Sequence, residues 1–332
     1  MGASIGGMQA FQRICAALPA DLPAAVFIVW HTALHSPGIL PDVLNRSARL
    51  PVAFARDGEA IEHGRVYVAP PDHHMLLWRD VVQLNRGPRQ NRFRPAVDPL
   101  FHSAADAFGP RVVGVIMTGG LDDGTAGLMH VKRERGVAVV QDPLDADEPG
   151  MPRSALEMVD ADFVLPIAQI PEVLVRLATE QPQPPIRLEE AKAQMYNSDK
   201  DIGQGLRPEG VTGPPAEVTC PDCSGALWRE TEDGVVKYRC HVGHSFTEQG
   251  LLAAKNEEVE LALWTALRVL KENATMYRNI IERSTAAGRL ASAEHFKQSL
   301  EQTEYELQVI KKALMTDSPG RAIRGERKSA PD

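Results

Sequence analysis

The sequence predicts an α/β domain with a mostly parallel sheet, followed by a small cysteine- and histidine-bearing module and two long helices. Short uninterrupted apolar runs, such as 24–30 and 112–117, have the character of strands buried on both faces. These runs alternate with helix-like segments over residues 1–178, which is the pattern of a parallel sheet flanked by helices. A Gln- and Pro-rich stretch at 181–185 ends the alternation.

The elements of the first domain are expected in a regular order. Helices are predicted over 8–18, 34–46, 100–108, 128–135, 152–159 and 170–178. Strands are predicted over 24–30, 52–55, 65–69, 112–117, 137–140 and 163–165, with a hairpin formed by 75–78 and 81–84. Only Met1 to Ala3 precede the first turn, so the strand that should open the sheet is expected to be truncated.

Five segments follow from composition. Residues 1–178 form the α/β domain, 179–217 a linker, 218–250 the cysteine-histidine module, 251–316 a helical hairpin and 317–332 a disordered tail. In the hairpin one apolar stripe runs along each helix and residues 286–288 break the pattern, so the helices pack on each other or also self-associate.

The composition excludes some classes of function. The chain of 332 residues is 43% apolar and carries a formal net charge of −8, a poor match for nucleic acid or an anionic membrane surface. No apolar run reaches the roughly 20 residues that span a bilayer, and no signal peptide is evident. We therefore expect a cytoplasmic protein with no nucleic-acid partner and no membrane insertion.

The first seven residues contain a candidate nucleophile. Ser4 lies in the small-residue turn Gly2 to Gly7, directly before a helix whose N-terminal amides could hold an oxyanion. His31 follows one predicted strand, and Asp122 and Asp123 follow another. Because functional residues gather outside the carboxyl ends of parallel strands, these side chains form a possible serine–histidine–aspartate set. A turn-forming serine, a structural histidine and loop aspartates are the alternative.

Several motifs resemble the catalytic domain of the chemotaxis protein-glutamate methylesterases. The motifs are Gly2-Ala3-Ser4-Ile5-Gly6-Gly7, His31 after the second strand, Thr118-Gly119-Gly120-Leu121-Asp122-Asp123-Gly124, Gly150-Met151-Pro152-Arg153, the run 66–74 and the stretches 86–88 and 95–98. They keep the order of that family and cover roughly residues 1–178.

The resemblance implies roles for single residues. Ser4 corresponds to the nucleophile, His31 to the base and Asp123 to the acid, with Asp122 as a loop residue. The resemblance also implies oxyanion donors near Ile5 and Gly120 and a substrate cleft near Met151, His73, His74 and the arginines of 86–94.

The implied reaction is hydrolysis of glutamate methyl esters on a chemoreceptor-like protein, and possibly glutamine deamidation, without a catalytic cofactor. Ile5, Trp30 and the sequence Gly120-Leu121 depart from the family pattern and put oxyanion geometry in question. The alternative is a catalytically weak scaffold that binds proteins through its C-terminal half.

The second module has the spacing of a zinc site. Cys220 and Cys223 form a C-x-x-C pair, and Cys240 with His244 forms C-x-x-x-H, separated by a predicted hairpin. Three cysteines and one histidine close a tetrahedral structural zinc site, and His244 is preferred to His241 because three intervening residues let the chain wrap the metal. Residues 220–246 contain three basic and four acidic side chains, and this balance argues against DNA binding.

Overall fold

The computed structural model describes residues 1–31, 38–180, 213–232 and 234–315. The chain divides into two compact units, one ending at Leu251 and the other beginning at Leu252. Residues 181–212 of the predicted linker, residue 316 of the predicted hairpin and the whole predicted tail 317–332 lie outside the described residues.

A seven-stranded parallel sheet forms the centre of the first unit, as the sequence predicts. Its order is β3-β4-β2-β1-β7-β8-β9, and every neighbouring pair is parallel. The strands are β1 Gly2–Ala3, β2 Ala25–Trp30, β3 Val52–Phe54, β4 Arg65–Val68, β7 Val113–Ile116, β8 Val137–Gln141 and β9 Phe163–Leu165.

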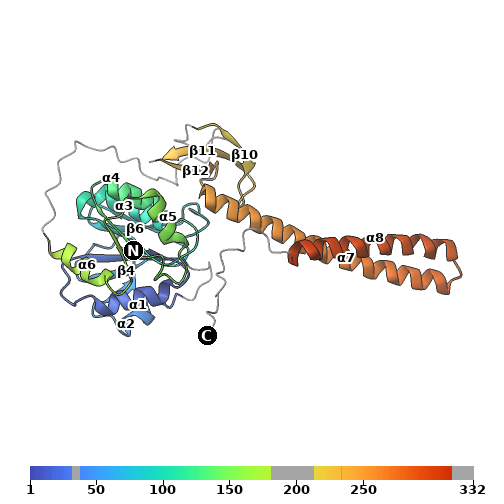
Figure 1. Ribbon diagram of the computed structural model, residues 1–332, viewed down its shortest axis with the longest axis horizontal. Helices are drawn as coiled ribbons and strands as arrows, with labels where there is room; N and C mark the ends of the chain where they lie inside the picture. The colour runs from blue at the N-terminus through green and yellow to red at the C-terminus, as the bar shows by residue number, and fades with distance from the viewer. Residues whose placement is uncertain (32–37, 181–212, 233, 316–332) are drawn as a thin grey trace, which may run out of the picture. The chain divides into compact units, whose positions relative to one another are not determined.

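Helices cover both faces of this sheet. They are α1 Gly7–Ala17, α2 Leu40–Asn45, α3 Val97–Phe108, α4 Thr125–Arg133, α5 Gly150–Met158 and α6 Ile170–Thr179, with a short 3-10 turn at Gly109–Arg111. One apolar core joins the sheet to α1, α2 and α6, and a second joins it to α3, α4 and α5 (Figure 1). This two-sided burial explains why the strands are apolar along their whole length.

The first strand is short, as expected, and it is nevertheless part of the sheet. β1 has only two residues, yet it pairs with β2 on one side and β7 on the other. The terminal ammonium of Met1 donates to the Phe27 carbonyl at 2.7 Å, and Val29 N donates to the Met1 carbonyl at 3.0 Å. Hydrogen bonds from two neighbours hold this short strand in the middle of the sheet.

Some element boundaries differ from the prediction. The helix expected over 34–46 is the shorter α2, with residues 32–37 outside the description. Helix α4 begins three residues before the predicted start, because Gly124 at φ 93° forms its left-handed N-cap. The predicted hairpin is present as β5 His74–Trp78 and β6 Val81–Asn85.

The cysteine-histidine module is a four-stranded antiparallel ribbon. Its strands are β10 Pro215–Thr219, β11 Ala226–Glu232, β12 Val235–Cys240 and β13 Ser245–Thr247, in that order across the sheet. A small core joins them: Cys220, Leu227, Cys240, Phe246 and Leu251. β10 begins inside the segment expected to be linker, so the ribbon extends further toward the N-terminus than its cysteines indicate.

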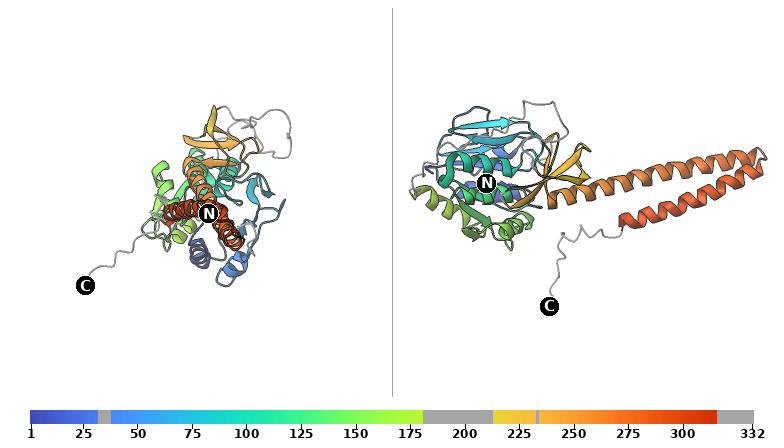
Figure 2. Two further views of the ribbon diagram at one scale, coloured as in Figure 1. Left: turned by 90° about the vertical axis from the view of Figure 1, so that its right-hand side faces the viewer. Right: turned by 90° about the horizontal axis from the view of Figure 1, so that it is seen from above.

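Two long helices complete the chain. α7 Glu248–Ala286 and α8 Leu290–Met315 run antiparallel, joined by a turn in which Gly288 has φ 68° (Figure 2). Arg278 pairs with Glu304 at 2.6 Å, and the rings of Tyr277 and Phe296 lie 6.0 Å apart. Within the described ranges, no helix combines the length and the apolar character needed to cross a bilayer.

Candidate active site

The two central strands place Ser4 beside His31. In the parallel pair of β1 and β2, Ala3 is opposite Trp30, so the next residues of both strands leave the sheet side by side. His31 N donates to the Ala3 carbonyl at 3.2 Å. Ser4 N donates at 2.9 Å to the carbonyl of Thr118, which follows β7 on the other side. The carboxyl edge of three adjacent strands therefore gathers the predicted residues.

The turn after Ser4 requires small residues. Gly6 has φ 77°, and a Cβ there would lie 2.6 Å from Asp147 Oδ2. Gly7 N donates to the Ser4 carbonyl at 2.9 Å as α1 begins. The indole N–H of Trp30, a departure from the family pattern, donates to the same carbonyl at 2.9 Å. Both bonds fix the backbone of the serine at the N-terminus of α1.

His31 is held by Asp123. His31 Nε2 and Asp123 Oδ2 are 2.6 Å apart, and both side chains are almost fully buried. The imidazole stacks on Phe93, with ring centroids 3.6 Å apart and planes 7° apart. The other ring nitrogen, Nδ1, is buried and has no hydrogen-bond partner among the residues that the structure describes. The imidazole therefore presents Nε2 to the acid and leaves Nδ1 to accept a proton, opposite to the chymotrypsin arrangement.

Asp123 is ionised despite its burial. Burial alone would raise its pKa, but the hydrogen bond and charge of His31, the Val97 amide and the Asn91 side chain together lower the pKa. Val97 N donates to Oδ2 at 2.6 Å, and Asn91 Nδ2 donates to Oδ1 at 3.0 Å. A carboxylate with this many donors can orient the histidine and balance a positive charge on it.

Two further carboxyl groups lie beside Asp123, and neither bonds His31. Asp122 Oδ1 accepts the Thr247 hydroxyl at 2.8 Å, and burial raises the Asp122 pKa to about 6. Asp98 accepts from Asn91 Nδ2 at 3.0 Å and from Gly127 N at 2.7 Å, and burial raises its pKa to about 7. The sequence motifs do not include Asn91, and they include Asp98 only as the last residue of the 95–98 stretch, to which no role was assigned.

The predicted oxyanion residues lie at the edge of this group. The amides of Ile5 and Gly120 have no hydrogen-bond acceptor within the described part of the chain, and Ile5 is 63% exposed. Gly119, to which the sequence analysis gave no role, packs directly against Ser4. A Cβ at Gly119 would lie 2.8 Å from Ser4 Cβ and would collide with the Met151 sulfur. Met151 is buried, and its N donates to the Gly119 carbonyl at 2.6 Å.

Comparison with known proteins identifies the family of the first domain. Residues 1–174 match the family described as CheB methylesterase, which is more than half of the chain. The chain belongs to the CheB methylesterase family. The resemblance drawn from the sequence and the prediction of a methylesterase-type hydrolase are thereby confirmed.

Individual relatives support the same assignment. A Leptospira interrogans protein is 38% identical over 178 residues, covering 53% of this chain and 92% of the relative. A Pyrococcus horikoshii relative named protein-glutamate methylesterase/protein-glutamine glutaminase is 36% identical over 180 residues, covering 53% of this chain and 49% of its own length. The crystal structure of the Thermotoga maritima CheB methylesterase catalytic domain has a TM-score of 0.52 and 35% identity, covering 53% of this chain and 95% of that domain.

The histidines and arginines expected around the methylesterase cleft have structural partners. His74 is buried, its Nε2 lies 3.0 Å from the Pro88 carbonyl, and burial lowers its pKa to about 4. His73 Nδ1 lies 2.9 Å from the Pro71 carbonyl. Arg86 and Arg94 both pair with Asp72. These contacts tie the 70–95 segment together, and they make His74 a poor candidate for a base.

The ribbon carries a second site. Each of four side chains, Cys220, Cys223, Cys240 and His244, offers a ligand atom, and these atoms lie within 4.8 Å of one another. Cys220 Sγ and Cys240 Sγ lie 3.6 and 3.5 Å from His244 Nδ1, and Cys223 Sγ lies 3.6 Å from Cys240 Sγ. His241 is instead exposed and lies against Gly225.

These distances fit a tetrahedral metal. With Zn–S of about 2.3 Å and Zn–N of about 2.05 Å, tetrahedral ligand atoms lie about 3.5 to 3.8 Å apart. Three of the six separations among the four ligand atoms fall in that range, and all six are within 4.8 Å. The cysteines are free thiols in the structure, so no disulfide competes for the sulfurs.

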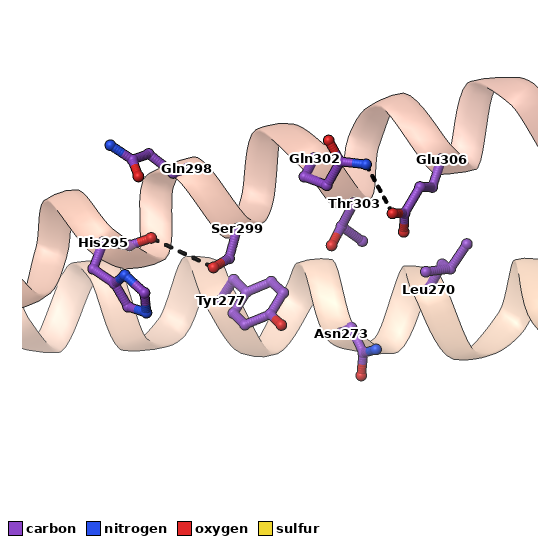
Figure 3. A pocket seen from close by; sticks show the side chains of 9 residues that line it. All are labelled: Leu270, Asn273, Tyr277, His295, Gln298, Ser299, Gln302, Thr303 and Glu306. Atoms are coloured by element: carbon purple, nitrogen blue, oxygen red, sulfur yellow. Dashed lines mark hydrogen bonds between the residues drawn. The ribbon is translucent and has the colours of Figure 1, made fainter.

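A hollow on the helical hairpin is a separate feature. It lies between α7 and α8, and its lining includes Tyr277, His295, Thr303 and Glu306 (Figure 3). Gln302 bonds Glu306 there at 2.9 Å, and the Ser299 hydroxyl donates to the His295 carbonyl at 3.4 Å. The hollow belongs to the second unit, and none of its lining residues comes from the methylesterase motifs.

Proposed function

We propose that this chain is a serine protein-glutamate methylesterase in which Ser4 is the nucleophile, His31 the base and Asp123 the acid. The observation that carries the proposal is the orientation of His31. Its Nε2 is bonded to a buried carboxylate, while its Nδ1 has no partner among the described residues. His31 directly follows β2, and Ser4 directly follows the neighbouring strand β1.

The reaction is acyl transfer in two halves. His31 Nδ1 takes the proton of the Ser4 hydroxyl while Oγ attacks the ester carbonyl, and Asp123 balances the imidazolium charge. The amides of Ile5 and Gly120 hold the oxyanion. His31 then returns the proton to the methoxy oxygen and methanol leaves. Water attacks the acyl-serine with the same base, which frees the glutamate and the enzyme.

The substrate class follows from the family and the names of relatives. We propose methylated glutamate side chains of a cytoplasmic chemoreceptor-like protein. Deamidation of glutamine is the second reaction, because an amide carbonyl accepts the same attack and ammonia leaves in place of methanol. The chain's own residues supply every step, so the reaction requires no cofactor.

The test measures methanol released from a methylated receptor fragment by the purified full chain. Ser4→Ala is expected to release none above background, whereas Ser47→Ala, at an exposed serine after α2, is expected to match the wild type. A fluorophosphonate probe should label the wild type and not Ser4→Ala. Equal turnover in wild type and Ser4→Ala would remove the assigned nucleophile.

We further propose that Cys220, Cys223, Cys240 and His244 hold one structural zinc ion. Burial raises the pKa of the Cys220 thiol to about 12, so a bound cation is needed to ionise it at neutral pH. Metal analysis of the full chain should give about one zinc per chain. Cys223→Ser should lose it and Cys15→Ala should keep it. A metal-free wild type whose cysteines alkylate freely would contradict the proposal.

A second role concerns the helical hairpin, for which we propose self-association. Large apolar side chains are exposed along it, among them Leu261, Trp264 and Tyr305 at 69%, 48% and 63%. Sedimentation analysis of the full chain tests this role, with Trp264→Glu expected to shift the protein toward the monomer. A wild type that is monomeric at all concentrations would exclude it.

A further inference from the structure

The ribbon makes hydrogen bonds to two neighbours of Asp123, namely Asp122 and Asn91. The Thr247 hydroxyl donates to Asp122 Oδ1 at 2.8 Å, and Thr247 N donates to Asn91 Oδ1 at 3.2 Å. Thr247, Asn91 and Asp122 are all buried. Since Asp122 is the chain neighbour of Asp123, strand β13 lies against the loop that carries the acid.

Asn91 connects the ribbon to Asp123. Its Nδ2 donates to both Asp123 and Asp98 at 3.0 Å, while its Oδ1 accepts from Thr247 N. An amide turned the other way would place its oxygen against two carboxyl groups and its nitrogen against an N–H donor. The Thr247 N–H therefore fixes the direction in which Asn91 donates.

Backbone bonds hold the same junction. Asn91 N donates to the Ser245 carbonyl at 2.8 Å, and Ser245 N donates to the Arg89 carbonyl at 3.2 Å. Asn91 itself has φ 48°, a left-handed conformation that costs free energy unless neighbours hold it. The first residue of β13 supplies that restraint.

Charge complements these bonds. Lys237 on β12 lies opposite Thr247 in the ribbon and is 6% exposed. Its positive charge acts to lower the pKa of Asp98 and of Asp122, against the larger effect of burial. The ribbon thus places a cation beside a cluster of buried acids that would otherwise repel one another.

We propose that Thr247 and Lys237 are positioning residues, through which the ribbon fixes Asn91 and the acid loop so that Asp123 orients His31. This inference rests on the proposed function. The metal-ligand group lies at the other end of the same two strands, since Cys240 ends β12 and His244 immediately precedes β13. Through Thr247 and Lys237, strands β12 and β13 therefore help to position the acid loop of this chain.

The test compares Thr247→Val, which removes the hydroxyl and keeps the shape, with Thr247→Ser, which restores it. Thr231→Val, an exposed threonine on β11, is the matched control. The first readout is the low-field proton NMR signal of the His31–Asp123 hydrogen bond in the resting full chain, which needs no substrate. The second is the split between kcat and KM for methyl ester hydrolysis.

For Thr247→Val we expect a shifted or broadened low-field signal and a fall in kcat of about tenfold with KM little changed, because a small misplacement of a catalytic group is costly. Thr247→Ser should recover both, and Thr231→Val should match the wild type. An unchanged signal in folded Thr247→Val overturns the inference, as does failure of Thr247→Ser to recover it. If the wild type has no esterase activity, the proposed function is wrong. The positioning role of Thr247 is still decided by the NMR comparison, which needs no substrate.

A second measurement applies if Thr247→Val does not fold. The wild-type chain is stripped of metal with a chelator, and circular dichroism checks that the α/β domain stays folded. The low-field signal should weaken, fluorophosphonate labelling should slow about tenfold, and added zinc should restore both. The inference is overturned if removal of the metal unfolds the ribbon and changes neither the low-field signal nor the labelling rate.

Discussion

Replacing Asp123 with asparagine tests the proposed acid directly. In the wild type, His31 Nε2 and Val97 N both meet Oδ2 at 2.6 Å, and Asn91 Nδ2 meets Oδ1 at 3.0 Å. An asparagine amide suits this set of donors in neither orientation. With its nitrogen at the Oδ1 position it faces Asn91 Nδ2, and with its nitrogen at Oδ2 it faces Val97 N and the histidine.

The first orientation costs less, since it keeps the two bonds made at the Oδ2 position and loses those at Oδ1 together with the negative charge. A unit charge pair at the 2.6 Å separation interacts by about 6 kcal/mol at an effective dielectric constant of about 20, an upper bound before solvation and relaxation. The retained neutral hydrogen bond restores about 1 kcal/mol of this. The difference of about 5 kcal/mol is the upper bound, and solvation and relaxation reduce the expected loss to about 3 to 4 kcal/mol. A loss of that size in the transition state lowers kcat by roughly two to three orders of magnitude.

The assay is steady-state methanol release, with fluorophosphonate labelling of Ser4 as a second measure. Asp122→Asn is the matched control, because its carboxyl lies in the same loop and bonds Thr247 rather than His31. It is expected to lose about tenfold or less. A larger loss in Asp122→Asn than in Asp123→Asn would refute the assignment of the acid. A loss under about tenfold in folded Asp123→Asn would refute the electrostatic role.

Two further predictions follow from other parts of the site. Gly119→Ala should slow labelling of Ser4 more than Gly120→Ala does, because its Cβ would lie 2.8 Å from Ser4 Cβ while that of Gly120 meets only Glu148 at 3.9 Å; equal rates would contradict this reading. Burial raises the Asp98 pKa from 3.8 to about 7, so between these values the folded state retains a proton that the unfolded chain has released. The contribution of Asp98 to the free energy of unfolding therefore falls as the pH rises through that window, by up to about 1.4 kcal/mol per pH unit. Asp98→Asn should flatten that slope in urea titrations between the pKa of 3.8 and the pKa of about 7, and an unchanged slope would show that Asp98 does not titrate there.

The sheet could be predicted from the sequence because both of its faces are buried. Strands such as β2 and β7 are apolar throughout, and their boundaries fall within a residue of the prediction. β1 was not readable, because a two-residue strand has no periodicity and its stability comes from neighbours far along the chain. β10 was missed for a related reason: its side chains are mostly exposed, so it has the polar character of a linker.

Residues of the candidate site could be predicted from the sequence only where they directly follow strands. Ser4, His31 and the acid loop each leave the carboxyl edge of the sheet, which is a rule of topology. Asn91 comes from a polar loop and Asp98 from the first turn of α3. Their roles depend on side-chain hydrogen bonds across long sequence separations, which leave no period or spacing. Thr247 lies further still, 125 residues from its partner Asp122.

The three buried acids explain why so many donors converge on this loop. Asp98, Asp122 and Asp123 cannot all be ionised at low cost in one apolar region. The donors are distributed unequally: Asp123 receives a histidine, a backbone amide and a side-chain amide, and its pKa is lowered. Asp98 and Asp122 keep raised pKa values, to about 7 and about 6. The negative charge is thereby concentrated on the one carboxyl group that bonds the imidazole, where the proposed mechanism requires it to balance the positive charge of the protonated histidine.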